Sequence, residues 1–169
     1  MIRIRLVYPA IFVACAGLLG FGLYLQHIVH LDPCPLCILQ RIAFIATGLT
    51  ALVAAVHNPQ KIGKAIYAIT MTIFAGIGAV IAGWHVWLQH TPRSKVVECG
   101  PGLEYMLDAF PLSKALPMIF RGSGDCGYIA WSFLGFSIPA WALVWFILFT
   151  LIGLALLVQA LRQRKHATA

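Results

Sequence analysis

Residues 138–161 read IPAWALVWFILFTLIGLALLVQAL, a continuous apolar stretch without a charged side chain. A helix of about 20 such residues is long enough to span the roughly 30 Å hydrocarbon core of a bilayer. An isolated strand or loop cannot cross lipid, because its backbone N–H and C=O groups would lack hydrogen-bond partners. We therefore expect this stretch to be a transmembrane helix.

Three further apolar runs of similar length precede it. Gly and Ala recur along all four runs, and small residues let helix backbones approach closely within lipid. The chain is 61% hydrophobic and 10% charged, with a mean hydropathy of +0.89, whereas soluble domains average about 25% charged residues. The sequence therefore predicts an all-α membrane protein, a four-transmembrane-helix bundle forming one domain over residues 1–169. The other three predicted spans are 8–26, 36–56 and 65–88.

The charged residues near the ends of the runs predict the orientation of the bundle. Cytoplasmic loops of membrane proteins carry an excess of Lys and Arg. We therefore expect both termini and residues 57–64 to be cytoplasmic, and the segments 27–35 and 89–137, which hold every acidic residue, to lie outside. The basic residues on the predicted cytoplasmic side are Arg3, Arg5, Lys61, Lys64, Arg162, Arg164 and Lys165.

The net charge of +7 does not indicate a nucleic-acid partner. A nucleic-acid interface needs Lys and Arg gathered on one face or along one helix. Here the basic residues form short clusters between apolar runs. We expect membrane lipid to surround this chain, and we expect no nucleic-acid partner.

The first apolar run has an alternative interpretation as a signal peptide. The motif FVAC, ending at Cys15, resembles a lipoprotein cleavage site. However, the apolar run continues to Tyr24, whereas a mature lipoprotein would turn polar after the cysteine. We favour a membrane helix in which Cys15 is a small buried apolar residue.

The remaining four cysteines, Cys34, Cys37, Cys99 and Cys126, all fall in the two predicted outer segments. Outside a bacterial cytoplasmic membrane lies the periplasm, where disulfides persist. Four cysteines allow three pairings, and structural disulfides remain an alternative. A zinc site of four thiolates is also possible, although the chain lacks the second closely spaced pair typical of such sites. A metal-binding or structural membrane protein whose cysteines never turn over is thus the competing hypothesis.

The Cys34–Cys37 spacing is typical of a redox pair. A disulfide across two residues closes almost no loop and would stabilise the fold little. Pro35 suits the first turn of a helix, and the second apolar run starts here. Cys37 should therefore lie at a helix N-terminus, where the helix dipole favours a thiolate.

Arg41 follows Cys37 by one helical turn on the same face and should lie deeper in the membrane. An intramembrane arginine is costly and indicates a functional site. The alternative is that its long side chain reaches back to the interface. We expect the guanidinium to point toward Cys37 and to stabilise a thiolate or an anionic ligand there.

His85 lies near the outer end of the third run, between Trp84 and Trp87. A histidine in such a position is commonly an interfacial anchor or a cap. A haem held by His85 with His27 or His30 is a further alternative, but haem bundles place matched histidines deeper on facing helices. We expect no haem.

The long outer segment contains one amphipathic pattern. Leu103, Met106, Leu107 and Phe110 share one helical face, and acidic residues take the opposite face. A short helix lying on the membrane surface fits this pattern. The glycine-rich stretch RGSGDCG around Cys126 predicts a mobile turn.

Together these motifs resemble the bacterial DsbB family. The resemblance rests on CPLCILQR (34–41), WHVWLQ (84–89), the separate Cys99, and GSGDCGYIAWSFLGFSIPAW (122–141). It covers nearly the whole chain and implies a thiol:quinone oxidoreductase of the inner membrane, part of the system that keeps the periplasm oxidising.

The resemblance also implies roles for individual residues. Through Cys99, a DsbA-like periplasmic thiol oxidase would reduce the Cys99–Cys126 disulfide, and the electrons would then pass to the Cys34–Cys37 pair. Cys37 would deliver them to a quinone, either ubiquinone or menaquinone. The same resemblance assigns quinone binding to Arg41, Cys37 and His85, with no metal in the working site.

Overall fold

The computed structural model describes residues 4–31, 33–60, 62–90 and 131–168 of the 169-residue chain. Four long helices dominate this part: α1 (Ile4–His27), α2 (Pro35–His57), α3 (Ile62–His90) and α6 (Ile138–Thr168). Within the described residues, these four are long and apolar enough to cross a membrane, over Leu6–His27, Pro35–His57, Ile62–His90 and Ile138–Gln163. The predicted fold class is confirmed.

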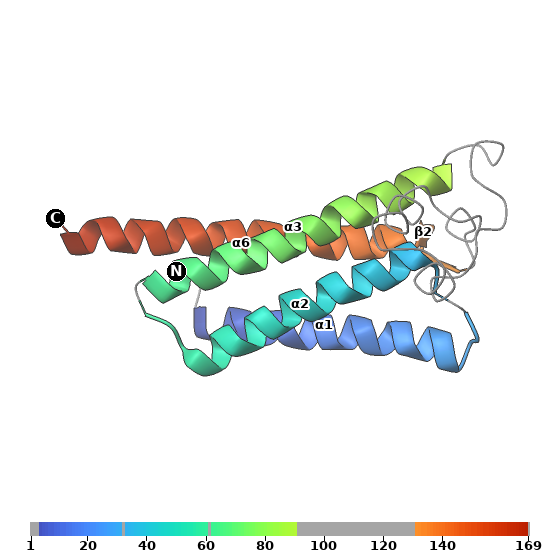
Figure 1. Ribbon diagram of the computed structural model, residues 1–169, viewed down its shortest axis with the longest axis horizontal. Helices are drawn as coiled ribbons and strands as arrows, with labels where there is room; N and C mark the ends of the chain where they lie inside the picture. Colours follow the sequence, from blue (N-terminus) through green and yellow to red (C-terminus); the bar gives the residue numbers. More distant parts are fainter. Residues whose placement is uncertain (1–3, 32, 61, 91–130, 169) are drawn as a thin grey trace, which may run out of the picture.

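The helices form an antiparallel bundle in which each contacts its neighbour in sequence. The closest association is between α3 and α6, followed by α2 with α3 and α1 with α2. Figure 1 shows that the two termini and the turn between α2 and α3 lie at one end of the bundle. The start of α2 and the strand β2 lie at the opposite end, which is the arrangement that the predicted orientation requires.

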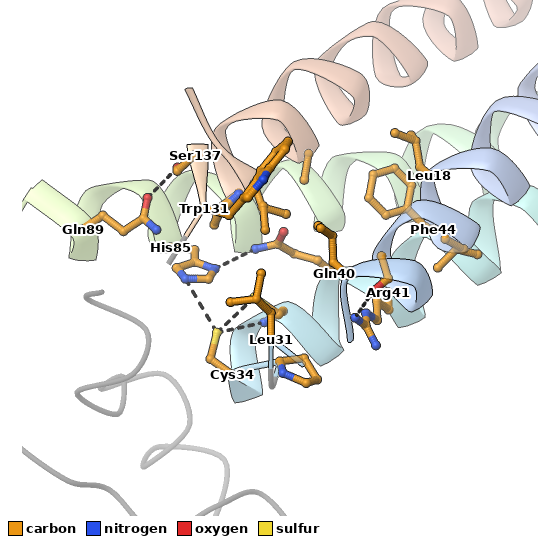
Figure 2. Close-up of a pocket in the computed structure, with 18 residues that line it drawn as sticks. Leu18, Leu31, Cys34, Gln40, Arg41, Phe44, His85, Gln89, Trp131 and Ser137 are labelled. Carbon is orange, nitrogen blue, oxygen red and sulfur yellow. Dashed lines mark hydrogen bonds between the residues drawn. The ribbon is translucent and has the colours of Figure 1, made fainter. Parts of the chain in front are cut away.

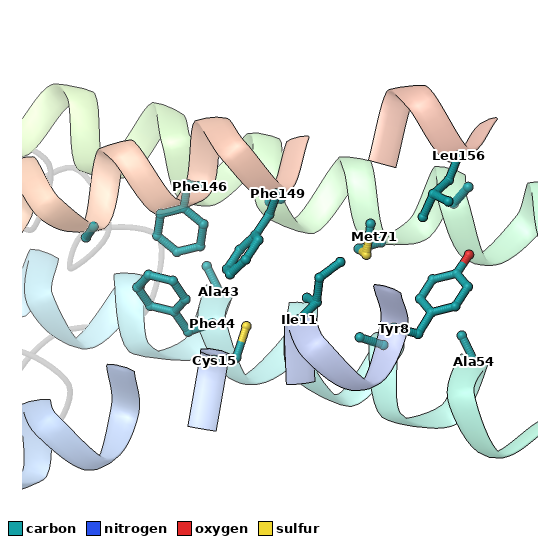
Figure 3. Packing of buried hydrophobic residues seen from close by; sticks show 14 of the residues in the cluster. Tyr8, Ile11, Cys15, Ala43, Phe44, Ala54, Met71, Phe146, Phe149 and Leu156 are labelled. Atoms are coloured by element: carbon teal, nitrogen blue, oxygen red, sulfur yellow. The ribbon is translucent and has the colours of Figure 1, made fainter. Parts of the chain in front are cut away.

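Small residues allow the helices to pack closely in the middle of the bundle. A Cβ atom added at Gly78 of α3 would overlap the ring of Phe146 of α6, and one added at Gly153 would overlap Thr72. Phe44 of α2 stacks on Phe146 with ring centroids 4.0 Å apart, as Figure 3 shows. The glycines therefore fix the helix spacing at which the aromatic side chains fill the centre.

Cys15 belongs to this apolar core. Its side chain is 1% exposed and lies against Gly48 of α2, beside Phe44 in Figure 3. The prediction that Cys15 is a small buried residue is confirmed. No water or polar partner is needed there, because a thiol packs as a small apolar group.

A two-stranded hairpin precedes α6. Strands β1 (Ser132–Phe133) and β2 (Phe136–Ser137) pair antiparallel, and Leu134 and Gly135 form the turn with φ of 53° and 80°. Two consecutive positive φ values are the signature of a type I′ turn. Residues 89–137 were expected to form one outer segment, so neither this hairpin nor the continuation of α3 to His90 was predicted from the sequence.

Four of the sequence-based predictions concern residues outside the described part of the chain. These are the positions of Cys99 and Cys126, the interfacial helix around residues 103–110, and the mobile turn at residues 121–127.

Candidate functional site

The first turn of α2 carries the closely spaced cysteine pair. Cys34 is the N-cap residue, with extended backbone, and its sulfur accepts a hydrogen bond from the backbone N–H of Cys37 at 3.4 Å. Pro35 occupies the first turn, where its missing N–H costs nothing. The prediction that Cys37 lies at the N-terminus of a membrane helix is confirmed.

The two thiols lie beside a histidine from α3. Cys34 Sγ donates to Cys37 Sγ across 3.1 Å, so the two sulfurs are hydrogen-bonded and not joined to each other as a disulfide. His85 Nε2 lies 3.7 Å from Cys34 Sγ. Cys34 and His85 are buried, and Cys37 is half-buried. The structure therefore brings together three of the residues that the sequence singled out.

The burial of His85 corrects one interpretation. An interfacial anchor would be exposed, but His85 is 2% exposed and faces the bundle interior, as Figure 2 shows. His27 and His30 are both exposed. They do not form with His85 the matched, buried pair that a haem requires.

Gln40 is a site residue that the sequence analysis missed. Its side chain is 4% exposed, and its Nε2 lies 3.0 Å from Nδ1 of His85. In this orientation the amide N–H donates to Nδ1, so a neutral imidazole carries its own proton on Nε2, facing Cys34. Gln40 stands within the quoted motif CPLCILQR (34–41) but was given no role; its signal in the sequence was a polar residue inside an apolar run, next to Arg41.

Arg41 points in a different direction from the one expected. Its guanidinium donates to Oε1 of Gln26 and to the backbone oxygen of Gly22, the latter at 3.0 Å. Both partners belong to α1, so the guanidinium is held by the neighbouring helix and does not point back toward Cys37. Figure 2 shows Arg41 near α1, away from Cys34. Arg41 nevertheless lines the same cavity as the cysteines.

A cavity of about 150 Å³ lies between these side chains. An engineered apolar cavity of about 150 Å³ in another protein binds benzene, so this cavity is large enough for a six-membered ring. Its walls come from the four long helices, the connection between α1 and α2, Trp131 and strand β2, as Figure 2 shows. The lining residues are Leu18, Leu19, Gly22, Leu25, Leu31, Pro33, Cys34, Cys37, Gln40, Arg41, Phe44, His85, Gln89, Trp131, Ser137, Ile138, Pro139 and Ala142.

The hairpin closes one side of this cavity. Ser137 donates from Oγ to Oε1 of Gln89 at 2.7 Å, which ties β2 to α3. Trp131 packs edge-on against Phe21 of α1, with ring centroids 5.6 Å apart. These contacts connect both sides of the bundle at its cysteine-bearing end.

The lining fits a quinone head group. A quinone ring is flat and apolar, with two carbonyl oxygens that accept hydrogen bonds. The apolar walls suit the ring, and His85 can donate from Nε2. A guanidinium has five N–H donors, so Arg41 can keep its bonds to α1 and also donate into the cavity.

These features define a multi-pass helical membrane protein that holds a dithiol pair beside a ring-sized cavity. The sequence model of the family described as disulfide bond formation protein DsbB matches residues 4–156. The chain belongs to the DsbB family. It is thus a disulfide-forming oxidoreductase, and the resemblance noted from its motifs is confirmed.

Relatives in several bacteria support this assignment. The chain is 51% identical over 146 residues to a disulfide bond formation protein B from Hahella chejuensis, covering 86% of this chain and 88% of the relative. It is 53% identical over 140 residues to the protein of that name from Aromatoleum aromaticum, covering 83% and 84%. The corresponding protein from Azoarcus sp. is 49% identical over 153 residues, covering 90% and 92%.

Proposed function

We propose that this protein reoxidises a DsbA-like dithiol oxidase of the periplasm and passes the electrons to a membrane quinone. Electrons would enter at the Cys99–Cys126 disulfide and continue to the Cys34–Cys37 pair. The membrane is the bacterial inner membrane, with the four cysteines on its periplasmic side.

One observation carries this proposal. Cys37 lies in the first turn of α2 and also lines the ring-sized cavity. A thiol in the first turn of this helix lies close to the end of the bundle, where a second cysteine pair can reach it. It is also adjacent to a space that a lipid-soluble ring can occupy. The position therefore suits a residue that takes electrons from a protein and gives them to a membrane acceptor.

The chemistry balances over two exchanges and one transfer. A dithiol of the partner becomes a disulfide, while the Cys99–Cys126 disulfide becomes two thiols. Those thiols then reduce the Cys34–Cys37 disulfide and are themselves reoxidised. Re-forming the Cys34–Cys37 bond releases two electrons and two protons. A quinone bound in the cavity supplies the oxidising power, because it takes up two electrons and two protons to become a quinol.

Side chains around the thiols assist the transfer. The N-terminus of α2 carries unpaired N–H groups and the positive end of the helix dipole, which favour the thiolate. In the tautomer with its proton on Nε2, His85 can donate a hydrogen bond to the sulfur of Cys34 and so stabilise a thiolate there. Arg41 would orient a carbonyl oxygen and stabilise negative charge that develops on it.

Dithiol-driven quinone reduction tests this function. Purified protein in bilayer discs is supplied with a reduced DsbA-like oxidase and either ubiquinone or menaquinone. We expect one quinol for each partner dithiol oxidised, and no quinol when Cys99→Ser or Cys126→Ser replaces the unmodified chain. Oxidation of the partner without stoichiometric quinol would refute the proposal. Comparing the turnover rate with a general dithiol oxidase and the rate with a specialised one identifies the physiological partner.

A further inference from the structure

Three metal-binding side chains converge at the start of α2. The sulfurs of Cys34 and Cys37 and a ring nitrogen of His85 all lie within 4.8 Å of one another. They come from two helices that pack together, so the backbone already holds them in place. Sequence spacing argued against zinc because the chain has no second closely spaced cysteine pair, but the fold supplies a third ligand from α3.

The distances are close to those of a tetrahedral zinc site. Zn–S bonds of about 2.3 Å and Zn–N bonds of about 2.1 Å place two sulfurs about 3.8 Å apart and a sulfur and nitrogen about 3.6 Å apart. Here Cys34 Sγ lies 3.7 Å from His85 Nε2 and 3.1 Å from Cys37 Sγ. Of these two distances, the sulfur–sulfur distance must increase, which a small side-chain rotation of the half-buried Cys37 can provide, and all three ligand atoms already lie within 4.8 Å of one another.

The charge of the site favours a soft divalent ion. Two thiolates and one divalent cation are neutral together, so burial of the complex avoids the cost of an isolated charge. No carboxylate lines this cavity among the described residues, which disfavours Mg²⁺ and Ca²⁺. Thiolate and imidazole ligands select Zn²⁺ and its close analogue Cd²⁺.

Gln40 is placed to orient the histidine in a metal complex. A histidine that ligates a metal through one nitrogen commonly donates its other ring N–H to an oxygen acceptor. Gln40 contacts Nδ1 of His85 through its amide. After an amide rotation its oxygen accepts from Nδ1–H, and the Nε2 lone pair then faces the sulfurs.

We propose that the reduced Cys34–Cys37 pair, together with His85, forms a redox-gated inhibitory site for Zn²⁺ or Cd²⁺. Binding converts two thiols to metal-bound thiolates and releases two protons. The disulfide form offers no thiolate and does not bind. The bound ion coordinates the sulfur of Cys37 and thereby stops electron transfer from this thiol to the quinone. Metal binding needs only the three side chains, whereas the inhibition rests on the proposed function.

Binding is tested first in a chain that has only this thiol pair outside the core. The Cys99→Ser/Cys126→Ser protein in bilayer discs is reduced, freed of reductant and titrated with Zn²⁺ or Cd²⁺ without oxygen. We expect one ion per reduced chain, protection of Cys34 and Cys37 from alkylation, and no binding at the same concentrations after oxidation. X-ray absorption should show two sulfur ligands and one histidine nitrogen.

Matched histidine variants test the third ligand. Removing a residue that only orients a ligand costs about tenfold or more in metal affinity, so His85→Ala should cost at least about tenfold. His90→Ala is the control, because His90 is exposed on the same helix and bonds to its own backbone through Nδ1. Its affinity should equal that of the parent.

Two results would overturn the site. One is equal metal binding by the reduced and oxidised forms, and the other is a spectrum without a nitrogen ligand. In the unmodified chain, Zn²⁺ should abolish dithiol-driven quinone reduction and a chelator should restore it. Full turnover at saturating Zn²⁺ would refute inhibition alone, and absence of turnover without metal would refute the relay alone.

Discussion

Cys15 and Cys37 are the same residue type on adjacent helices, yet their surroundings are opposite. Cys15 lies in the middle of the bundle, packed against Gly48 and 1% exposed. Cys37 lies in the first turn of α2, half-buried, hydrogen-bonded to Cys34 and beside a cavity. Position along the bundle, and not the residue type, therefore decides which cysteine has a thiol partner and a neighbouring cavity.

The same contrast extends to the two regions as a whole. In the middle, Phe44 stacks on Phe146 and the helices approach closely at Gly78 and Gly153, while the other side of Phe44 borders the cavity. At the cysteine-bearing end, buried Gln40 and His85 hydrogen-bond to each other around a cavity. The packed region fixes the distance between the helices. The cavity lies at the polar end of the same bundle.

Replacing each of the two cysteines in turn tests the contrast between them. Cys37→Ser should reduce dithiol-driven quinol formation by at least about a thousandfold, because serine cannot form the disulfide that releases the electrons. Cys15→Ser should change the rate by less than about twofold and lower stability by roughly 1–3 kcal/mol, because it buries a hydroxyl in an apolar core. Rates and thermal unfolding are measured in the same discs. Equal rates for the two variants would contradict the contrast.

Arg41 tests whether the polar end binds the acceptor. Arg41→Met keeps most of the side-chain volume but removes charged hydrogen bonds, each worth about 1.5–3 kcal/mol. We expect a loss of about tenfold to a hundredfold in kcat/KM for quinone, with unchanged exchange between partner and protein. Arg162→Met, an exposed site near the other end of the bundle, is the control. A wild-type quinone dependence in Arg41→Met would remove Arg41 from the site.

Two glycines of α3 test the packed region. Gly78→Ala should destabilise the bundle by about 1–3 kcal/mol, because the new methyl group meets the ring of Phe146. Gly76→Ala meets nothing within 4 Å and should be neutral or slightly stabilising through higher helix propensity. Thermal unfolding in detergent compares the two variants. Similar stabilities would show that close packing at Gly78 does not hold the helices in place.

Gln40 gives the smallest expected effect. Gln40→Leu removes the partner of His85 Nδ1 and should slow quinol formation by about tenfold, corresponding to one hydrogen bond of about 1.4 kcal/mol. Thr47→Val is the matched control, because Thr47 is buried two turns further along α2 and donates to its own helix. The ¹⁵N chemical shifts of His85 report its tautomer. An unchanged tautomer and rate in Gln40→Leu would show that Gln40 only fills space.

Much of this architecture was readable from the sequence because hydropathy alone separates membrane helices from loops. Each of the four long helices contains one predicted span, and the start of α2 followed from Cys34 and Pro35. The hairpin was missed because its strands are two residues long, too short for an alternating pattern. Its one local signal was Gly135 at the second turn position.

The site was only partly predictable for a different reason. Cys34, Cys37 and Arg41 were found by spacing and by the cost of polar groups in lipid, whereas His85 received a site role only through the family resemblance. The direction of Arg41 depends on Gln26 and Gly22 of α1, and the partner of His85 is Gln40 of another helix. Such contacts between helices leave no periodic trace in a single sequence.

We propose that the electron acceptor binds in the cavity beside Cys37, away from the packed middle of the bundle. Photolabelling with a photoreactive quinone in bilayer discs, followed by peptide mapping, tests it most directly. We predict labels on cavity-lining residues such as Leu18, Phe44 and Ala142, lost on addition of excess quinone and reduced in Arg41→Met. Labels confined to lipid-facing residues such as Val53 and Val80, which are 50% and 73% exposed, would contradict the account.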